Sequence, residues 1–247
     1  MEGKFFKYFD ERYRGNVLKE KSESFGPIIT ISRLTGCDAG AVAKCLVKAL
    51  NKQENTTKWR WLDKEILLNT ARELDTGASN VESYIKRHHL SGFSEMLMSI
   101  SGKYISDDKV RKTIKEVVLT ICREGYVVLV GRGGVSLTGS VTKALHVRLV
   151  APFYWRVENI VKKKKLDIEA AEEYVLDNDE KRHNLIVSFL DKKPVTLDYL
   201  FDVTMNRSSF SVEQIADILC LLYKKKMDAV SSGGLRSKKG PLMNAYG

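Results

Sequence analysis

The side chains best suited to chemistry in this sequence are three arginines. Arg132 lies in a glycine-rich turn, 131–134, directly after an apolar run, whereas Arg156 and Arg182 lie in a charged segment with a helical pattern. A guanidinium makes paired hydrogen bonds to phosphate, and positioned arginines stabilise the charge on a transferring phosphoryl group. We therefore assign Arg132, Arg156 and Arg182 as candidate catalytic residues. A solvated turn is the alternative for Arg132, and an ion pair with a nearby aspartate is the alternative for Arg182.

The segment 32–40 is a candidate phosphate-binding loop. It joins an apolar run to a helical pattern and contains Gly36 and Gly40, so backbone amides could converge on an anion at a helix N-terminus. In the strict P-loop pattern the glycines stand one residue further apart and a Lys follows, where this chain has Ala41. An ordinary strand-to-helix turn is the alternative. The residues assigned to phosphate binding are Ser32, Arg33, Thr35, Gly36, Cys37, Asp38, Ala39 and Gly40.

Asp63 is a candidate acid on the acceptor side, because it directly follows the short predicted strand 59–62. A carboxylate there could hold a ligand hydroxyl or a base, and the alternative is that Asp63 caps the helix after it. Arg60 and Arg87 could also contact a base edge. The residues assigned to acceptor binding are Asp63, Gly131 and Arg132.

Alternating strand and helix patterns must position these residues. Apolar runs predict buried strands at 27–32, 126–130 and 144–150, and short strands are expected at 59–62 and 201–205. Helical spacing predicts helices at 41–50, 64–74, 80–124, 156–190 and 212–226, the last opened by a capping box at Ser211. Such alternation predicts an α/β fold with a parallel sheet, whose ligands bind at the carboxyl ends of the strands.

The charge distribution limits the choice of partners. The chain has 247 residues and a net charge of +10, with six basic residues and one acid in 224–247 and five basic residues and one acid in 156–165. Because the charge lies in a predicted flexible tail and one helix rather than along a folded face, nucleic acid is an unlikely partner. The scattered cysteines predict no structural metal or disulfide framework, and no segment resembles a leader or a membrane span, so a cytoplasmic location is expected.

Six phrases, in order, cover most of residues 27–220. They are ITISR (29–33), LDKEIL (62–67), VVLVGRGG (127–134), LHVRLVAP (145–152) with Arg156, DEKR (179–182) and FDVTMNRSSFSVEQIADIL (201–219). On these phrases the chain resembles the cytidylate kinase-like family of P-loop nucleoside monophosphate kinases. The resemblance implies a three-layer P-loop NTPase fold, with a helical monophosphate-binding insertion at about 60–124 and a lid at about 156–190. The kinase-like domain would then span 26–226, between an extension, 1–25, and a flexible basic tail, 227–247.

The resemblance also implies an activity, namely transfer of the γ-phosphoryl group of ATP to a nucleoside monophosphate such as CMP, with Mg²⁺. Ser32-Arg33 and Gly36 match the family's loop, Arg132 matches its Gly-Arg-Gly turn, and Asp63 matches its acceptor-side acid. Arg156 and Arg182 match its lid arginines. The sequence leaves the metal ligand open among Ser32, Thr35 and Asp38.

The phosphate loop departs from the family pattern. Where the family commonly reads Gly-Ser-Gly-Gly-Arg, this chain has Gly-Cys-Asp-Ala-Gly at 36–40, so Gly40 replaces an Arg and Asp38 adds a negative charge. An anion beside a triphosphate is unfavourable unless a cation compensates it. The alternative function is therefore a degenerate kinase-fold protein that binds a nucleotide or a partner without catalysis. A third hypothesis is nucleic-acid or protein binding by the basic tail.

Overall fold

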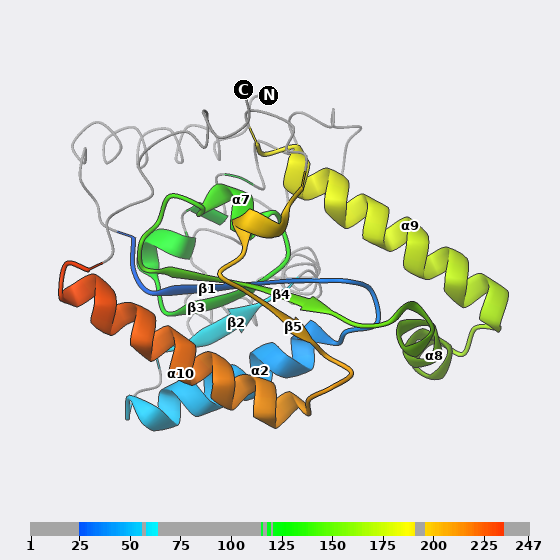
Figure 1. The fold of residues 1–247 in the computed structure, drawn as a ribbon, viewed down its shortest axis with the longest axis horizontal. Helices are drawn as coiled ribbons and strands as arrows, with labels where there is room; N and C mark the ends of the chain where they lie inside the picture. Colours follow the sequence, from blue (N-terminus) through cyan, green and yellow to red (C-terminus); the bar gives the residue numbers. More distant parts are fainter. Residues whose placement is uncertain are drawn as a thin grey trace, which may run out of the picture.

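Five strands form one parallel sheet in the computed structural model, which describes residues 25–55, 58–63, 115, 118–119, 121–190 and 196–234. The sheet order is β2-β3-β1-β4-β5, and every neighbouring pair of strands is parallel (Figure 1). The strands are β1 Ile28–Arg33, β2 Arg60–Leu62, β3 Val127–Val130, β4 Ala144–Val150 and β5 Val203–Asn206. This arrangement confirms the predicted α/β architecture.

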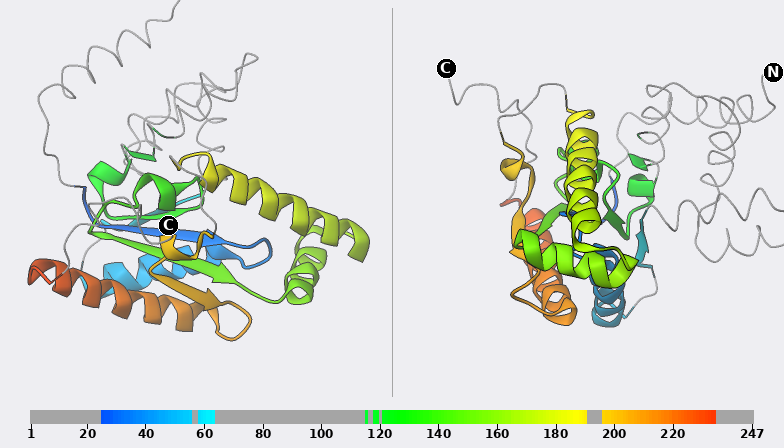
Figure 2. Two further views of the ribbon diagram at one scale, coloured as in Figure 1. Left: turned by 45° about the horizontal axis from the view of Figure 1, so that its top comes forward. Right: turned by 90° about the vertical axis from the view of Figure 1, so that its right-hand side faces the viewer.

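Helices follow the strands in the order α2, α7, α8, α9 and α10. The first and last, α2 and α10, lie side by side on one face of the sheet, and α7 lies on the other face (Figure 1). The helices α8 and α9 lie beyond the carboxyl end of β4 (Figure 2). Their bounds are α2 Ala39–Gln53, α7 Gly134–Leu137, α8 Phe153–Lys164, α9 Ile168–Val187 and α10 Val212–Ser231, with a 3-10 turn at Asp198–Leu200.

The central strand β1 is buried on both faces, as its continuous apolar run predicts. Ile29 and Ile31 pack with Leu46 of α2 and Leu219 of α10 on one face, whereas Ile28 belongs to the core on the other face. All three isoleucines are fully buried. Because side chains alternate between faces, a slip of one residue would exchange the two cores, so this packing sets the register of β1. This packing therefore fixes the position of the carboxyl end of β1, where the phosphate loop begins.

The segment 156–190, predicted as one helix, consists of two helices. Lys165 has a left-handed backbone conformation, φ 58°, which ends α8, and the Asp167 carboxylate accepts a hydrogen bond from the Ala170 amide at 2.8 Å, which starts α9. The two helices then pack against each other through a small apolar cluster: Val157, Ile160, Ala171 and Val175. This break lets α9 turn back toward the phosphate loop.

The capping box predicted at Ser211 is confirmed, since the Ser211 side chain accepts from the Gln214 amide and the Gln214 side chain accepts from the Ser211 amide. However, α10 continues past its predicted end at 226 to Ser231. Met227 packs partly buried against the main core, which extends the helix into the segment predicted to be tail. The predicted tail therefore begins too early.

Several predictions fall on other parts of the chain. The extension 1–25 except Phe25, the helix 64–74, most of the helix 80–124 and the tail from 235 onward lie outside the described residues. Residues 115, 118–119 and 121–124 are helical, as predicted. Among the residues that the structure describes, no helix is both long and apolar enough to cross a membrane.

Asp202 ties β4, β5 and α10 together. Its Oδ2 atom accepts hydrogen bonds from the His146 amide at 2.8 Å and from the Lys226 ammonium at 2.5 Å, and its own amide donates to the His146 carbonyl. Burial alone would raise the pKa of this carboxyl, but the hydrogen bonds from Lys226 and His146 outweigh burial and hold the pKa below its usual range. The ionised carboxylate therefore stabilises the fold.

We expect Asp202→Asn to lower the free energy of unfolding at pH 7 by about 1 kcal/mol, a modest loss because solvent partly screens the pair. Since the pKa is lower in the folded state, this contribution is present above about pH 4 and disappears as the pH falls through the folded value. Urea denaturation at pH 7 and at about pH 3 measures it. Asp228→Asn, at an exposed position of α10, is the control. A difference between Asp202→Asn and wild type that is equal at both pH values would contradict the assignment.

Candidate functional site

The phosphate loop, residues 32–40, leads from the end of β1 to the start of α2. Gly36 and Asp38 have positive φ values, 91° and 45°, and the Leu34 amide is anchored to the Leu149 carbonyl of β4 at 3.0 Å. The Asp38 side chain does not cap α2, and the amides of Ala39 and Gly40 donate to no acceptor among the described residues. Free amides at the N-terminus of a 15-residue helix favour an anion.

A carboxylate from α9 contacts this loop. Asp179 Oδ1 accepts hydrogen bonds from both the amide and the hydroxyl of Thr35, each at 2.6 Å. Its Oδ2 accepts from Arg156 Nη1 of α8 at 2.7 Å, and that same nitrogen donates to the Thr35 carbonyl at 3.2 Å. Arg156 is buried, with 6% of its surface exposed, so the ion pair compensates a charge that would otherwise be costly to bury. The loop, α8 and α9 are thus joined at one point.

Three further arginines converge beside the loop. Burial, together with the positive charges of Arg182 and Arg132, lowers the pKa of Arg33 to about 10, and Asp63 opposes this shift. Burial likewise lowers the pKa values of Arg132 and Arg182, opposed by Asp63 and Asp179 respectively. Neighbouring cations depress one another's pKa values only when they lie close together in a partly dry environment. The arginine cluster, Arg33, Arg132 and Arg182, therefore creates a field that favours an anion.

The turn after β3 brings Arg132 to this cluster. Gly131 donates its amide to the Ile31 carbonyl of β1 at 3.0 Å and has a φ of 77°. A Cβ at Gly131 would collide with the Arg33 guanidinium, so only glycine lets Arg33 lie across this turn. Arg132 itself adopts a positive φ of 59°. Such strain in a non-glycine residue concentrates at functional sites.

The remaining loop residues have different environments. The Cys37 side chain is fully buried, and burial raises the pKa of its thiol to about 11, so only its backbone can contribute to a site. Ser32 is also buried, with 8% exposed. Asp38 is half-exposed and pairs with Lys163 of α8 at 3.3 Å. This lysine of α8 is therefore a cation that pairs with Asp38 from outside the loop.

Some contacts of the site were not anticipated. The sequence interpretation considered Asp179 only as an ion-pair partner of Arg182, and that pair exists at 3.6 Å. Its bond to Thr35, 144 residues away in the chain, has no local signal. Asn159 of α8, which donates to the Gly36 carbonyl at 3.3 Å, was also missed. Arg87, a predicted base contact, lies outside the described residues.

The acceptor-side candidates reach the site to different extents. The Asp63 carboxylate lies 3.7 Å from the position that a Cβ on Gly40 would take, which places it at the start of α2. Arg60 instead pairs with Glu124 at 2.6 Å. Within the described ranges, no group of three His, Cys, Asp or Glu side chains is arranged to hold a metal ion. Asp63 acts electrostatically on Arg33 and Arg132, and the Thr35 hydroxyl accepts a hydrogen bond from Arg182, so both side chains bring oxygen atoms to the arginine cluster.

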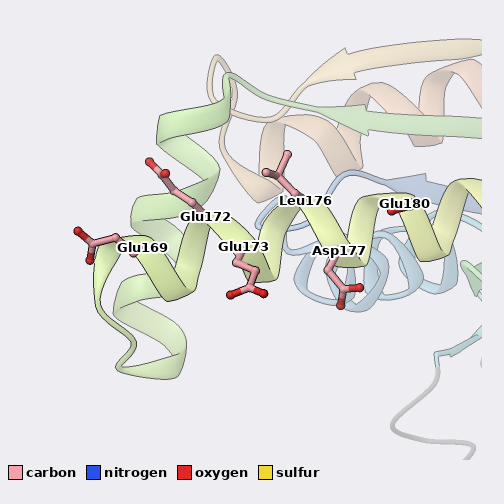
Figure 3. Close-up of a pocket in the computed structure, with 6 residues that line it drawn as sticks. All are labelled: Glu169, Glu172, Glu173, Leu176, Asp177 and Glu180. Carbon is pink, nitrogen blue, oxygen red and sulfur yellow. The ribbon is translucent and has the colours of Figure 1, made fainter.

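The outer face of α9 carries a separate acidic surface. A surface pocket of about 690 Å³ there is lined by side chains of this one helix (Figure 3). Five carboxylates would repel a phosphate, so this pocket is not part of the arginine site. The lining residues are Glu169, Glu172, Glu173, Leu176, Asp177 and Glu180.

The sheet order, the loop and the arginine positions define a P-loop kinase fold. The cytidylate kinase-like family matches residues 28–209, which is most of the chain, and the protein belongs to this family. The family resemblance predicted from the six sequence phrases is therefore confirmed.

Individual proteins that are similar to this chain share only a small part of its sequence. A solved structure of an uncharacterized protein from Eubacterium ventriosum is 17% identical, covers 81% of this chain and 98% of its own, and superimposes with a TM-score of 0.51. A shikimate kinase from Acinetobacter baumannii, solved with shikimate, is 15% identical, covers 85% and 96% of the two chains, and has a TM-score of 0.41. A protein of Corynebacterium glutamicum named uronate isomerase is 26% identical over 148 residues. The match includes 60% of this chain but only 28% of the length of that relative.

Proposed function

We propose that the protein transfers the γ-phosphoryl group of ATP to a nucleoside monophosphate such as CMP. The observation that carries this proposal is the convergence of Arg33, Arg132 and Arg182 beside a helix N-terminus whose amides are available to an anion. Phosphoryl transfer requires positioning and charge neutralisation more than covalent chemistry, and this arrangement would supply both. Membership of the cytidylate kinase-like family supports the same reaction class.

The residues divide between two substrates. The amides of Ala39 and Gly40 and the dipole of α2 would hold ATP phosphates, whereas Arg33 and Arg132 would hold the phosphate of the acceptor. Arg182 donates to the Thr35 hydroxyl of the loop and acts electrostatically on Arg33, so it would be able to neutralise charge on the group in transfer. Arg156 acts differently, because its guanidinium is engaged by Asp179 and by the Thr35 and Ala151 carbonyls. It would therefore position the loop and α9 as long as Asp179 occupies this place.

A magnesium ion fits this site as a companion of the nucleotide. Mg²⁺ takes most of its ligands from phosphates and water and needs only one or two protein oxygens, which Asp63 and Thr35 can supply. The ion would neutralise phosphate charge. The residues of the chain would orient the two phosphate groups and exclude water between them.

The test is a coupled assay of ADP release with CMP, dCMP and UMP as acceptors. We expect ATP-dependent turnover with at least one of them. The absence of turnover with all three, in a protein shown by calorimetry to bind ATP, would overturn transfer and favour the second candidate, a kinase-fold protein that binds nucleotide without catalysis. The observation in favour of that candidate is the loop itself, in which Gly40 replaces an arginine.

Replacing Gly40 with Arg tests how far the loop has lost phosphate affinity. A Cβ at this position meets no atom closer than the Asp63 carboxylate at 3.7 Å, so a side chain can begin here without a collision. We expect Gly40→Arg to tighten ATP binding about tenfold, as one added charge-assisted contact would. Gly40→Gln, which adds similar bulk without charge, is the control, and calorimetry is the measurement. Unchanged affinity in Gly40→Arg would indicate that Arg33 already serves the ATP phosphates.

A further inference from the structure

The Asp179 carboxylate makes the contacts that a transferred phosphoryl group would need. It accepts from a loop amide and from a hydroxyl, both of Thr35, and from the Arg156 guanidinium, and Arg182 lies 3.6 Å away. An amide, a hydroxyl and two arginines around one anion form a typical phosphate environment. In this structure a side chain of the protein supplies that anion.

We propose that Asp179 is an internal substitute for a nucleotide phosphate, so that the protein without nucleotide is closed on its own carboxylate. The inference rests on the proposed function, because it assigns the loop to a nucleotide phosphate. A bound phosphate oxygen must take the Thr35 amide from Asp179. The carboxylate then leaves the loop, and Arg156 and Arg182 become available to the ligand.

Asp179 differs from the other acidic residues of α9 in the direction of its side chain and in its burial. The carboxylates at 169, 172, 173, 177 and 180 lie on the outer face of the helix (Figure 3). Asp177 is 49% exposed and pairs with Lys181 at 2.6 Å one turn away, an arrangement that contributes little. Asp179 is only 18% exposed and turns inward to the loop. A solvated ion pair does not account for its two bonds to Thr35.

Two anions cannot use this place at once. One amide hydrogen serves one acceptor well, and two negative charges within a few ångströms repel each other strongly in a partly dry site. The apparent affinity for phosphate is therefore reduced by the fraction of molecules in which Asp179 occupies the loop. A ligand with several charges overcomes this barrier more readily than a monoanion.

The test compares Asp179→Asn with wild type in the full chain, using pyrophosphate as the probe. Calorimetry should show about tenfold tighter pyrophosphate binding in Asp179→Asn, because the competing carboxylate is gone. Asp177→Asn, which removes one charge from the same helix, is the matched control and should leave the affinity within about twofold of wild type.

The amide resonance of Thr35 adds a readout of contact rather than charge. Without ligand, its chemical shift should differ between wild type and Asp179→Asn, and at saturating pyrophosphate the two shifts should converge. A difference that persists at saturation would overturn displacement of the carboxylate. An equal gain of pyrophosphate affinity in Asp177→Asn would also overturn the inference, because the loss of one negative charge would then explain the tighter binding.

A measurement on the wild type covers the case in which Asp179→Asn fails to fold because Arg156 loses its partner. The Thr35 amide resonance of the wild type should move as pyrophosphate is added, because a phosphate oxygen replaces the Asp179 carboxylate as the acceptor of that amide. A Thr35 amide resonance that does not move, while calorimetry shows that pyrophosphate binds, would overturn the inference. If wild type binds pyrophosphate and no variant gains affinity, only this inference fails. If neither wild type nor any variant binds it, the proposed function fails as well.

Discussion

Replacing Arg132 by Ala should lower kcat/KM for transfer to the acceptor about 1000-fold. This side chain belongs to the arginine cluster beside the phosphate loop, where it shares Asp63 as a nearby countercharge with Arg33. Arginines that neutralise a transferring phosphoryl group contribute about 10³-fold or more to the rate. The coupled assay with the best acceptor among CMP, dCMP and UMP measures the effect. Because Arg132 would hold the acceptor phosphate both before and during transfer, the loss should appear in the KM of the acceptor as well as in kcat.

Two further variants make this prediction specific. Arg132→Lys keeps the charge but loses the paired hydrogen bonds, so it should recover only part of the activity. Arg148→Ala removes an arginine of β4 that pairs with Asp198 on the surface, and it should stay within about twofold of wild type. A loss in Arg148→Ala as large as that in Arg132→Ala would show that general positive charge, rather than this site, supports the reaction.

Gly36→Ala should cause the largest loss of stability among the loop variants, about 3 kcal/mol. Gly36 has a φ of 91°, and a Cβ there would come within 2.6 Å of the Arg156 carbonyl oxygen and 2.9 Å of the Arg156 Cα. Backbone atoms of α8 cannot move aside without breaking the contact between α8 and the loop. Urea denaturation of wild type and variant measures the change.

Gly233 is a control that separates the energetic cost of the collision from the cost of a side chain in this backbone conformation. Gly233, after α10, has a similar positive φ of 73° but no atom within 4 Å of its Cβ position. Gly233→Ala should therefore cost only about 1 kcal/mol, the ordinary penalty for this conformation. Equal losses in the two variants would show that α8 does not press on Gly36 in solution. The loop variant should also weaken pyrophosphate binding, whereas the control should not.

The sheet was predictable because each of its strands is a local pattern. Runs such as 127–130 and 144–150 are apolar at every position or nearly so, and only a strand buried on both faces is stabilised by such composition. The break at Lys165 was not predictable from periodicity. The helical pattern continues through 156–190, and the left-handed turn depends on the packing of α8 against α9.

The sequence by itself determined the order of strands and helices, the family, and the positions of Arg33, Arg132 and Arg182 after or beside predicted elements. These features depend on local composition and spacing, which a single chain displays directly. Only the tertiary structure decided that Asp179 bonds to Thr35 and that Lys163 pairs with Asp38. It also decided that Arg156 is buried and positions the loop. Partners more than 100 residues apart meet because helices dock on a sheet, and the strength of each contact depends on burial and geometry that no local pattern encodes.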